Sequence, residues 1–219
     1  MILLFDINET VLDLEPVARR VRSVLGSHDA AELWFTTLLH HSVAMSLAGQ
    51  FTPMSAIGAA VLKMLADGRR IALSDDQAHA VVAGMTALPA HPDVEPTLAR
   101  LSGAGVRLAA LSNSSTAALR TQLRHAGLDP YFEKQLSVEQ VGKYKPHPDV
   151  YLRAAAAMGV PPGECMMVAA HGWDVAGAAW AGMNSAFVAR GTHRPFPLGP
   201  TPTHVVHDLV QLADLLLAP

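Results

Sequence analysis

The chain begins with a short apolar run that ends in a carboxylate. Residues 2–5, Ile-Leu-Leu-Phe, are followed directly by Asp6. A continuous apolar run of this length is typical of a strand buried on both faces, as in a parallel sheet. The polar residues 6–10 would form the loop at its carboxyl end, the edge where open α/β sheets bind ligands. The alternative is that Asp6 only caps a helix.

Strand and helix patterns alternate along the second half of the chain. This alternation predicts a Rossmann-like α/β core, a parallel sheet with helices on both faces. Strands are predicted at residues 106–111, 135–138, 165–169, 186–189 and 204–206, and helices at 150–158 and 175–181.

Between the first two strands the apolar residues recur at helical spacing. Trp34, Leu38, His41 and Met45 follow each other at threes and fours, and residues 53–65 repeat the pattern. We therefore expect three or four helices here. The predicted organisation is a HAD-like α/β core domain of residues 1–13 and 90–219, with a helical cap domain of residues 14–89.

Composition narrows the classes of partner. The 219 residues carry a net charge of −3 and only 5% aromatic residues, which argues against nucleic-acid binding. No run of some 18 uncharged apolar residues exists, so no membrane span is expected. The single cysteine, Cys165, excludes an intramolecular disulfide and favours a cytoplasmic location. A small molecule is the expected partner.

Polar side chains follow four of the predicted strands, at the edge where ligands bind. They are Asp6 with Thr10, Ser112 with Asn113, Lys145, and the stretch from His171 to Asp174. In this order, and with a helical block after the first strand, they make the chain resemble the haloacid dehalogenase (HAD) superfamily over nearly its whole length. The resemblance implies that Asp6 is a nucleophile.

Two chemistries occur in that superfamily, and residue types favour one of them. The phosphatases use Mg²⁺, which prefers several carboxylate ligands. Their pattern needs an acid two residues after the nucleophile and a Gly-Asp pair in the fourth motif, where this chain has Asn8 and Ala170. Asn8 cannot protonate a departing alkoxide, whereas a halide leaves without a proton. We therefore expect a cofactor-free reaction with no metal, and no histidine spacing predicts a metal cluster.

The chain most resembles the type II L-2-haloacid dehalogenases. The shared features are Thr10, the Leu-Ser-Asn-Ser run at 111–114, Tyr144-Lys145-Pro146, Tyr151, and Trp173-Asp174 followed by Gly177-Ala178. The resemblance implies that Asp6 displaces halide from a short 2-haloalkanoic acid, forming an ester on its own side chain. Water oriented near Asp174 would then release a 2-hydroxy acid.

The resemblance also implies supporting roles for other residues. Lys145 would keep Asp6 ionised, since a cation within about 4–6 Å can lower a carboxylate pKa by roughly 1–3 units. Thr10 would fix the Asp6 side chain. Ser112 and the N–H groups around Asn113 would bind the substrate carboxylate. The alternatives are a helix cap for Ser112, an ordinary surface lysine, and packing roles for Tyr151 and Trp173.

Four positions depart from the type II pattern. Phe35 stands where those enzymes usually carry an arginine that holds the halide, Asn8 replaces a tyrosine, and Ala169 and His171 replace a serine and an asparagine. Halide would then be stabilised by His41, Asn113, Trp173 or a tighter aromatic pocket. We hypothesise that His171 positions or deprotonates the hydrolytic water; the alternative is a structural hydrogen bond.

Two rival functions stay open at this stage. One is an Mg²⁺-dependent phosphatase of the same fold, acting on a small phosphomonoester. The other is a non-catalytic binder of small anions. The family resemblance further implies a homodimer formed through the helical cap.

Overall fold

A six-stranded parallel sheet forms the centre of the molecule. The computed structural model describes residues 1–218. The strand order is β3-β2-β1-β4-β5-β6, so the first strand lies between β2 and β4. The strands are β1 (Ile2–Phe5), β2 (Arg107–Ser112), β3 (Lys134–Ser137), β4 (Cys165–Ala169), β5 (Asn184–Val188) and β6 (His204–Val206). The predicted α/β fold of the superfamily is confirmed.

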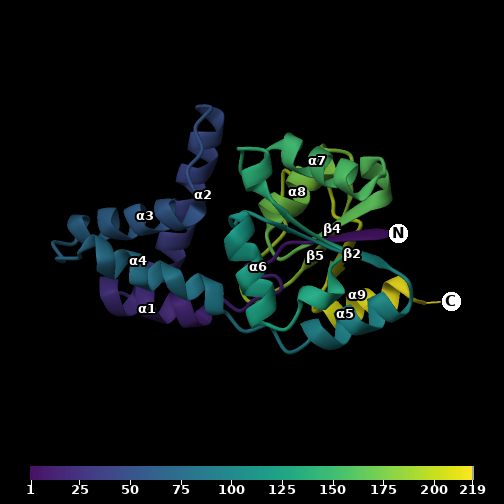
Figure 1. Cartoon of the computed structure of the whole chain (residues 1–219), viewed down its shortest axis with the longest axis horizontal. Helices are drawn as coiled ribbons and strands as arrows, with labels where there is room; N and C mark the ends of the chain where they lie inside the picture. The colour runs from purple at the N-terminus through teal and green to yellow at the C-terminus, as the bar shows by residue number, and fades with distance from the viewer. Residues whose placement is uncertain (219) are drawn as a thin grey trace.

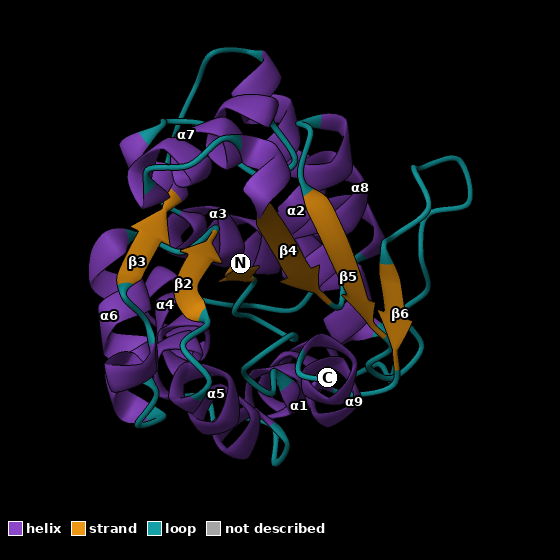
Figure 2. Cartoon of the chain, turned by 90° about the vertical axis from the view of Figure 1, so that its right-hand side faces the viewer, coloured by secondary structure: helices purple, strands orange, loops and turns teal. Residues whose placement is uncertain are grey.

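Helices cover both faces of this sheet. Figures 1 and 2 show α7 and α8 on one face and α5 and α9 on the other. The core helices are α5 (Val94–Gly103), α6 (Thr116–His125), α7 (Pro148–Met158), α8 (Gly172–Trp180) and α9 (Leu209–Leu216). Every residue of β1 and β4 is buried, in agreement with their continuous apolar sequences.

Residues 15–87, here called the helical segment, lie at the carboxyl ends of the strands (Figure 1). They form α1 (Glu15–Leu25), α2 (Ala30–Leu47), α3 (Met54–Gly68), α4 (Asp75–Ala83) and the 3-10 turn η1 (Gly84–Ala87). The chain leaves and re-enters the core at one place, where Leu12 and Ala90 form an antiparallel bridge. Inside the segment, Trp34 is buried and donates a 2.9 Å hydrogen bond to the Gly58 carbonyl. Its definition as a separate cap domain stays a prediction.

Most element boundaries differ from the predictions by a few residues. The helix predicted from residue 175 begins at Gly172, so Trp173 and Asp174 belong to its first turn. The strand predicted from residue 186 begins at Asn184, because residues 184 and 185 pair with β4 in spite of their polar side chains. Within residues 1–218, no helix combines the length and apolarity that a membrane crossing requires.

Candidate active site

The Asp6 carboxylate is the point where the strand-end side chains meet. Asp6 directly follows β1, and its N–H continues the ladder to the Val168 carbonyl of β4 at 3.0 Å. One carboxylate oxygen, Oδ1, lies 2.8 Å from Lys145 Nζ. The other, Oδ2, lies 2.7 Å from the Thr10 hydroxyl and 3.1 Å from His171 Nδ1. The structure therefore brings Thr10, Lys145 and His171 to the predicted nucleophile.

Lys145 and its partners form one side of the site, here called the lysine side. All three ammonium hydrogens are directed at oxygen atoms: Asp6 Oδ1, the Leu111 carbonyl at 3.0 Å and Asp174 Oδ2 at 2.6 Å. The Tyr151 hydroxyl donates to Asp174 Oδ1 at 2.6 Å. The side chains of Lys145 and Asp174 are 0% exposed. This side is a closed ion-pair network with its donors used up.

Gly177 on α8 makes the close packing of the lysine side possible. A Cβ atom at this position would lie 2.5 Å from the Pro146 Cβ and 2.8 Å from the Tyr151 hydroxyl, both far inside van der Waals contact. Only glycine lets α8 approach α7 closely enough for Tyr151 to reach Asp174. The Gly177 that follows the fourth motif in the sequence is thus a packing requirement of the site.

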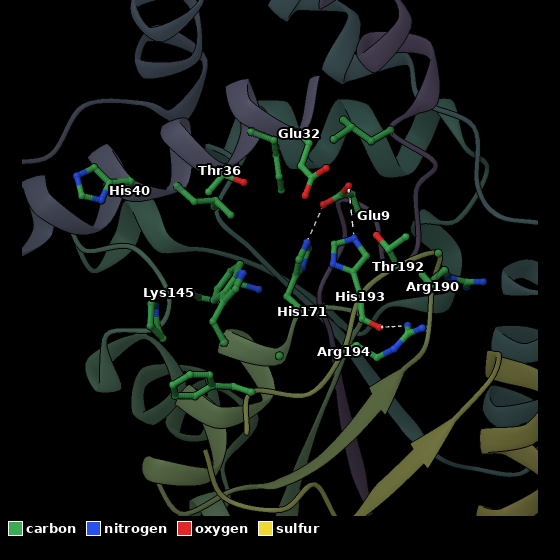
Figure 3. Close-up of a pocket in the computed structure, with 18 of the residues that line it drawn as sticks. Glu9, Glu32, Thr36, His40, Lys145, His171, Arg190, Thr192, His193 and Arg194 are labelled. Atoms are coloured by element: carbon green, nitrogen blue, oxygen red, sulfur yellow. Dashed lines mark hydrogen bonds and ion pairs between the residues drawn. The ribbon is translucent and has the colours of Figure 1, made fainter. Parts of the chain in front are cut away.

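His171 and Glu9 form the opposite side, here called the histidine side (Figure 3). His171 Nε2 lies 2.8 Å from Glu9 Oε2, while Nδ1 faces Asp6. His193 Nε2 is 3.8 Å from the other Glu9 oxygen. Glu9 has a φ of 64°, unusual for a residue with a side chain, and this places its carboxylate beside His171. One imidazole therefore bridges two carboxylates.

Electrostatics at Asp6 favour the ionised nucleophile. Burial raises the pKa of Asp6, but the charges and hydrogen bonds of Lys145 and His171 outweigh it, so the pKa falls well below the usual range. Burial likewise lowers the pKa of Lys145, while Asp174 and Asp6 outweigh this and raise it. For Asp174, burial and the neighbouring Asp6 charge raise the pKa in spite of Lys145. Asp6 is the better ionised of the two carboxylates.

The two carboxylates beside His171 favour its cationic form, which argues against its predicted role as a base. Burial lowers its pKa, but hydrogen bonds to Asp6 and Glu9 outweigh burial and raise it to about 10. Burial raises the pKa of Glu9, and the two histidines beside it lower it to about 2. An imidazolium with both N–H groups engaged has no lone pair for a proton. The two contacts therefore favour His171 as a hydrogen-bond donor over the predicted base.

Four predicted substrate-binding residues are buried near Asp6 and have protein partners. The Ser112 hydroxyl accepts the Ser114 N–H at 3.1 Å. Asn113 Oδ1 accepts the Lys145 N–H at 3.0 Å, which fixes the amide so that its NH₂ group points the other way. Asn8 accepts from Gln122 at 2.9 Å and donates weakly to Ser114 at 3.4 Å. Tyr151 contacts Asp174, as described above. The Asn8 side chain thus makes hydrogen bonds within the protein, while the Asn113 NH₂ group makes no hydrogen bond among the described residues.

A cavity of about 1150 Å³ lies between the helical segment and the core. Phe35 and Trp173 line it, and both rings stack against His171, with ring centroids 6.0 and 5.1 Å away. His40 lines the cavity, whereas His41 does not and packs edge-on against His40 instead. The prediction of His41 as a site residue was therefore wrong, because helix periodicity alone could not tell which of two adjacent residues faces the core.

The sequence analysis missed Glu9 and His193. Glu9 was predicted only as part of a polar loop. Its contact with His171 depends on a left-handed backbone conformation that no sequence pattern predicted. His193 lies in the long loop after β5, about 190 residues from Asp6 in sequence. Only the appearance of an acid next to Asn8 could have hinted at a second carboxylate near the nucleophile.

The residues present do not fit the magnesium site of the phosphatases. The Asn8 side chain is held by Gln122 and Ser114, and position 170 is alanine. Asp6 and Asp174 are bridged by the Lys145 ammonium, which already supplies the positive charge between them. We therefore expect no step of the reaction to depend on magnesium.

One group of potential metal ligands does occur within residues 1–218, against the expectation from histidine spacing. The ligand atoms of Glu9, His171 and His193 lie within 4.8 Å of one another. The 2.8 Å hydrogen bond between His171 and Glu9 and the protonation of His171 account for this arrangement as an ion pair. A metal ion would have to displace that proton.

Comparisons with known proteins agree with this geometry. Residues 1–182 match the model of the haloacid dehalogenase-like hydrolase family. The chain belongs to this family. It is 28% identical over 216 residues to "(S)-2-haloacid dehalogenase 1" of Pseudomonas sp. (strain CBS-3), covering 97% of this chain and 95% of that protein.

Solved structures of dehalogenases share the fold of this chain. A solved L-2-haloacid dehalogenase superposes with a TM-score of 0.92 at 28% identity, covering 99% of this chain and 98% of that one. A dehalogenase solved as an intermediate complex superposes with a TM-score of 0.89 at 28% identity, covering 99% and 96%. The resemblance to L-2-haloacid dehalogenases is thus confirmed for the whole chain.

Proposed function

We propose that this hydrolase converts short 2-haloalkanoic acids, such as haloacetates and 2-halopropionates, to 2-hydroxy acids through an ester on Asp6, without a cofactor. The observation that carries the proposal is the Asp6 carboxylate held ionised between Lys145 and His171, with Asn8 in place of the acid that protonates the leaving group in the phosphatases. Halide needs no such proton, whereas an alkoxide does. The names of the relatives support the same reaction.

The hydrogen bonds of Asp6 favour Oδ1 as the attacking atom. A carboxylate oxygen accepts about two hydrogen bonds. Among the described residues, Oδ2 accepts from both Thr10 and His171, while Oδ1 accepts only from Lys145. The remaining lone pair of Oδ1 is free to attack the carbon that bears the halogen. The new C–O bond forms as the C–X bond breaks, and halide departs with the electron pair.

Substrate anions would be held by neutral donors near the strand ends. The Ser112 hydroxyl hydrogen and the fixed NH₂ group of Asn113 are uncommitted among residues 1–218. We assign them to the substrate carboxylate. The indole of Trp173 on the cavity wall, with Phe35 opposite, would surround the halide in place of the family arginine. His171 contributes its charge there but no N–H.

The helical segment would close this site as a cap domain. Its helix α2 supplies Phe35, Leu39 and His40 to the cavity wall. The segment also exposes the apolar side chains of Leu33, Leu47 and Met64, and we propose that it forms a homodimer interface. Light scattering on the purified protein would give the oligomeric state. The buried free thiol of Cys165 fits the proposed cytoplasmic location.

One experiment separates this proposal from its phosphatase rival. Purified protein is assayed with chloroacetate and with a phosphomonoester, each with and without EDTA. Halide release that resists the chelator supports the proposal. Phosphate release that EDTA abolishes, without halide release, would overturn it. Binding of chloroacetate with neither product would indicate an anion binder.

A further inference from the structure

The second oxygen of the nucleophile, Asp6 Oδ2, faces two fixed donors. The Thr10 hydroxyl lies 2.7 Å away, and its oxygen accepts the Ala170 N–H at 2.9 Å, so the hydroxyl hydrogen is directed at Asp6. His171 Nδ1 lies 3.1 Å from the same oxygen, and its Nε2–H is taken by Glu9. Both donors are held by groups other than substrate before any reaction begins.

We propose that Thr10 and His171 form an oxyanion hole for hydrolysis of the Asp6 ester, with Glu9 as the positioning residue that holds His171 in it. The inference rests on the proposed function and concerns its second step. It replaces the base role predicted for His171 and gives a role to Glu9, which the sequence analysis missed.

The chemistry of this step places negative charge on Oδ2. After alkylation at Oδ1, Oδ2 is the uncharged carbonyl oxygen of the ester. Water attacks the Asp6 Cγ, and the carbonyl electron pair moves to Oδ2. Collapse re-forms the carbonyl and breaks the Cγ–Oδ1 bond, so Oδ1 leaves in the 2-hydroxy acid. One proton of the water ends on the product hydroxyl and the other in solvent.

A cationic donor is most effective at an oxygen that gains charge only in the transition state. In the ester the charge of Asp6 is gone, yet His171 still has Glu9 as its counterion, and Lys145 still has Asp174. Each cation is therefore kept by a second carboxylate when its first partner is consumed. The Glu9 carboxylate also sustains the raised pKa of His171 at this stage.

Packing holds the imidazolium in its orientation. Phe35 and Trp173 both stack against it, at interplanar angles of 29° and 27°. The loop that carries His193 lies tightly against Gly172, where a Cβ atom would come within 2.5 Å of the Arg194 carbonyl oxygen. The hydrogen bond to Glu9 (Figure 3) and the two stacked rings oppose a rotation that would turn Nδ1 away from Asp6.

The test separates the two steps of one turnover. EDTA-treated enzyme is mixed with (S)-2-chloropropionate in a rapid-quench instrument, and halide and the esterified Asp6 peptide are measured over time. In His171→Ala, we expect a full burst of one halide per site, followed by ester hydrolysis about 10²-fold slower than in the parent enzyme. His171→Asn, which keeps a neutral N–H donor, should recover part of this loss.

The pH profile of Glu9→Gln distinguishes a donor from a base. Loss of the Glu9 charge lowers the pKa of His171, so a donor role predicts that ester hydrolysis declines at lower pH than in the parent enzyme. A base role predicts the reverse, hydrolysis that rises with pH through that pKa. Glu164→Gln, an exposed acid at the amino end of β4, is the matched control and should match the parent enzyme.

Two further outcomes distinguish failure of the oxyanion-hole proposal from failure of the proposed function. If the parent enzyme releases halide and labels Asp6 but neither histidine variant accumulates ester, the oxyanion hole is refuted and the proposed function stands. If the parent enzyme forms no ester at all, the proposed function itself fails.

Discussion

The lysine side and the histidine side of Asp6 each contain a cation and a second carboxylate, but they differ in their exposure to solvent. On the lysine side, Lys145 and Asp174 are both 0% exposed, and Lys145 also contacts Asp6, whose side chain is 7% exposed. On the histidine side, His171 bridges Asp6 and Glu9, and the Glu9 side chain is 22% exposed at the cavity wall. Each cation is shared between the nucleophile and a second carboxylate.

This difference suggests a division of work between stability and chemistry. Buried charges that are fully paired are costly to disturb, because removal of one partner leaves the other uncompensated. Charges at the edge of a cavity are partly solvated and can respond to substrate. The lysine side would therefore fix the nucleophile, and the histidine side would act on the ester.

Replacing Asp6, the hydrogen-bond acceptor that both sides share, should have the largest effect on activity. Asp6→Asn eliminates the nucleophile, so we expect steady-state halide release to fall by at least about 10⁴-fold. Ion chromatography of halide measures it, and circular dichroism checks the fold. Turnover within tenfold of the parent enzyme would show that another group performs the displacement.

Breaking the lysine side should cost more stability than breaking the histidine side. Lys145→Met leaves two buried carboxylates without their cation, and we expect the free energy of unfolding to fall by about 3–5 kcal/mol. Glu9→Gln, at a partly exposed site, should cost only about 1 kcal/mol. Urea unfolding of both variants measures the difference. Equal losses would contradict the division proposed here.

Tyr151→Phe tests the outer part of the lysine side. The substitution removes the hydrogen bond to Asp174 Oδ1 and leaves that buried oxygen unpaired. We expect a loss of about 1–3 kcal/mol in urea unfolding, with smaller effects on ester formation. No change in stability would mean that water replaces the hydroxyl, in conflict with the closed network.

Alkaline pH should weaken the histidine side alone. The pKa of His171 is raised from 6.5 to about 10, so its contribution to stability is complete below pH 6.5 and is lost as pH rises through about 10. Activity should decline over the same upper range. The charged groups around the ring are Asp6, Glu9 and His193, and Glu32, Arg190 and Arg194 line the same cavity.

At acidic pH, the stability of the histidine side should change in the opposite direction. The pKa of Glu9 is lowered from 4.5 to about 2, so its stabilising contribution is present above pH 4.5 and is lost as pH falls through about 2. Thermal melts from pH 2 to 11 would record both limbs. An alkaline limb that persists unchanged in His171→Asn would assign it to another group.

The smallest effect is expected at His41. The sequence analysis placed it in the site, but the structure puts His40 on the cavity wall. His41→Ala should therefore leave kcat/KM for (S)-2-chloropropionate within about twofold of the parent enzyme, consistent with a surface substitution. A loss of tenfold or more would place His41 in the site after all.

Sequence reasoning succeeded where local pattern and position agree. Apolar runs and the alternation of strand and helix patterns located all six strands, and strand ends in a parallel sheet must share an edge, so Asp6, Lys145 and Asp174 could be grouped without coordinates. The lysine side was therefore predictable as a unit. The family resemblance added the roles of Thr10 and Tyr151.

Only His171 of the histidine side could be predicted, from its place at a strand end, because Glu9 and His193 depend on backbone geometry and loop packing. Glu9 reaches His171 only through its left-handed φ, and His193 arrives in a loop with no regular structure. The protonation of His171 follows from two carboxylates that sequence spacing could not bring together. Loops thus carry the parts of this site that the sequence could not group with Asp6.

Incorporation of oxygen from water tests the central claim most directly. One turnover with excess enzyme is run in ¹⁸O-water, and the peptide that contains Asp6 is analysed by mass spectrometry together with the product acid. The account predicts one ¹⁸O atom in the Asp6 carboxylate and none in the hydroxyl of the 2-hydroxy acid. Label in the product hydroxyl with an unlabelled Asp6 peptide would contradict it.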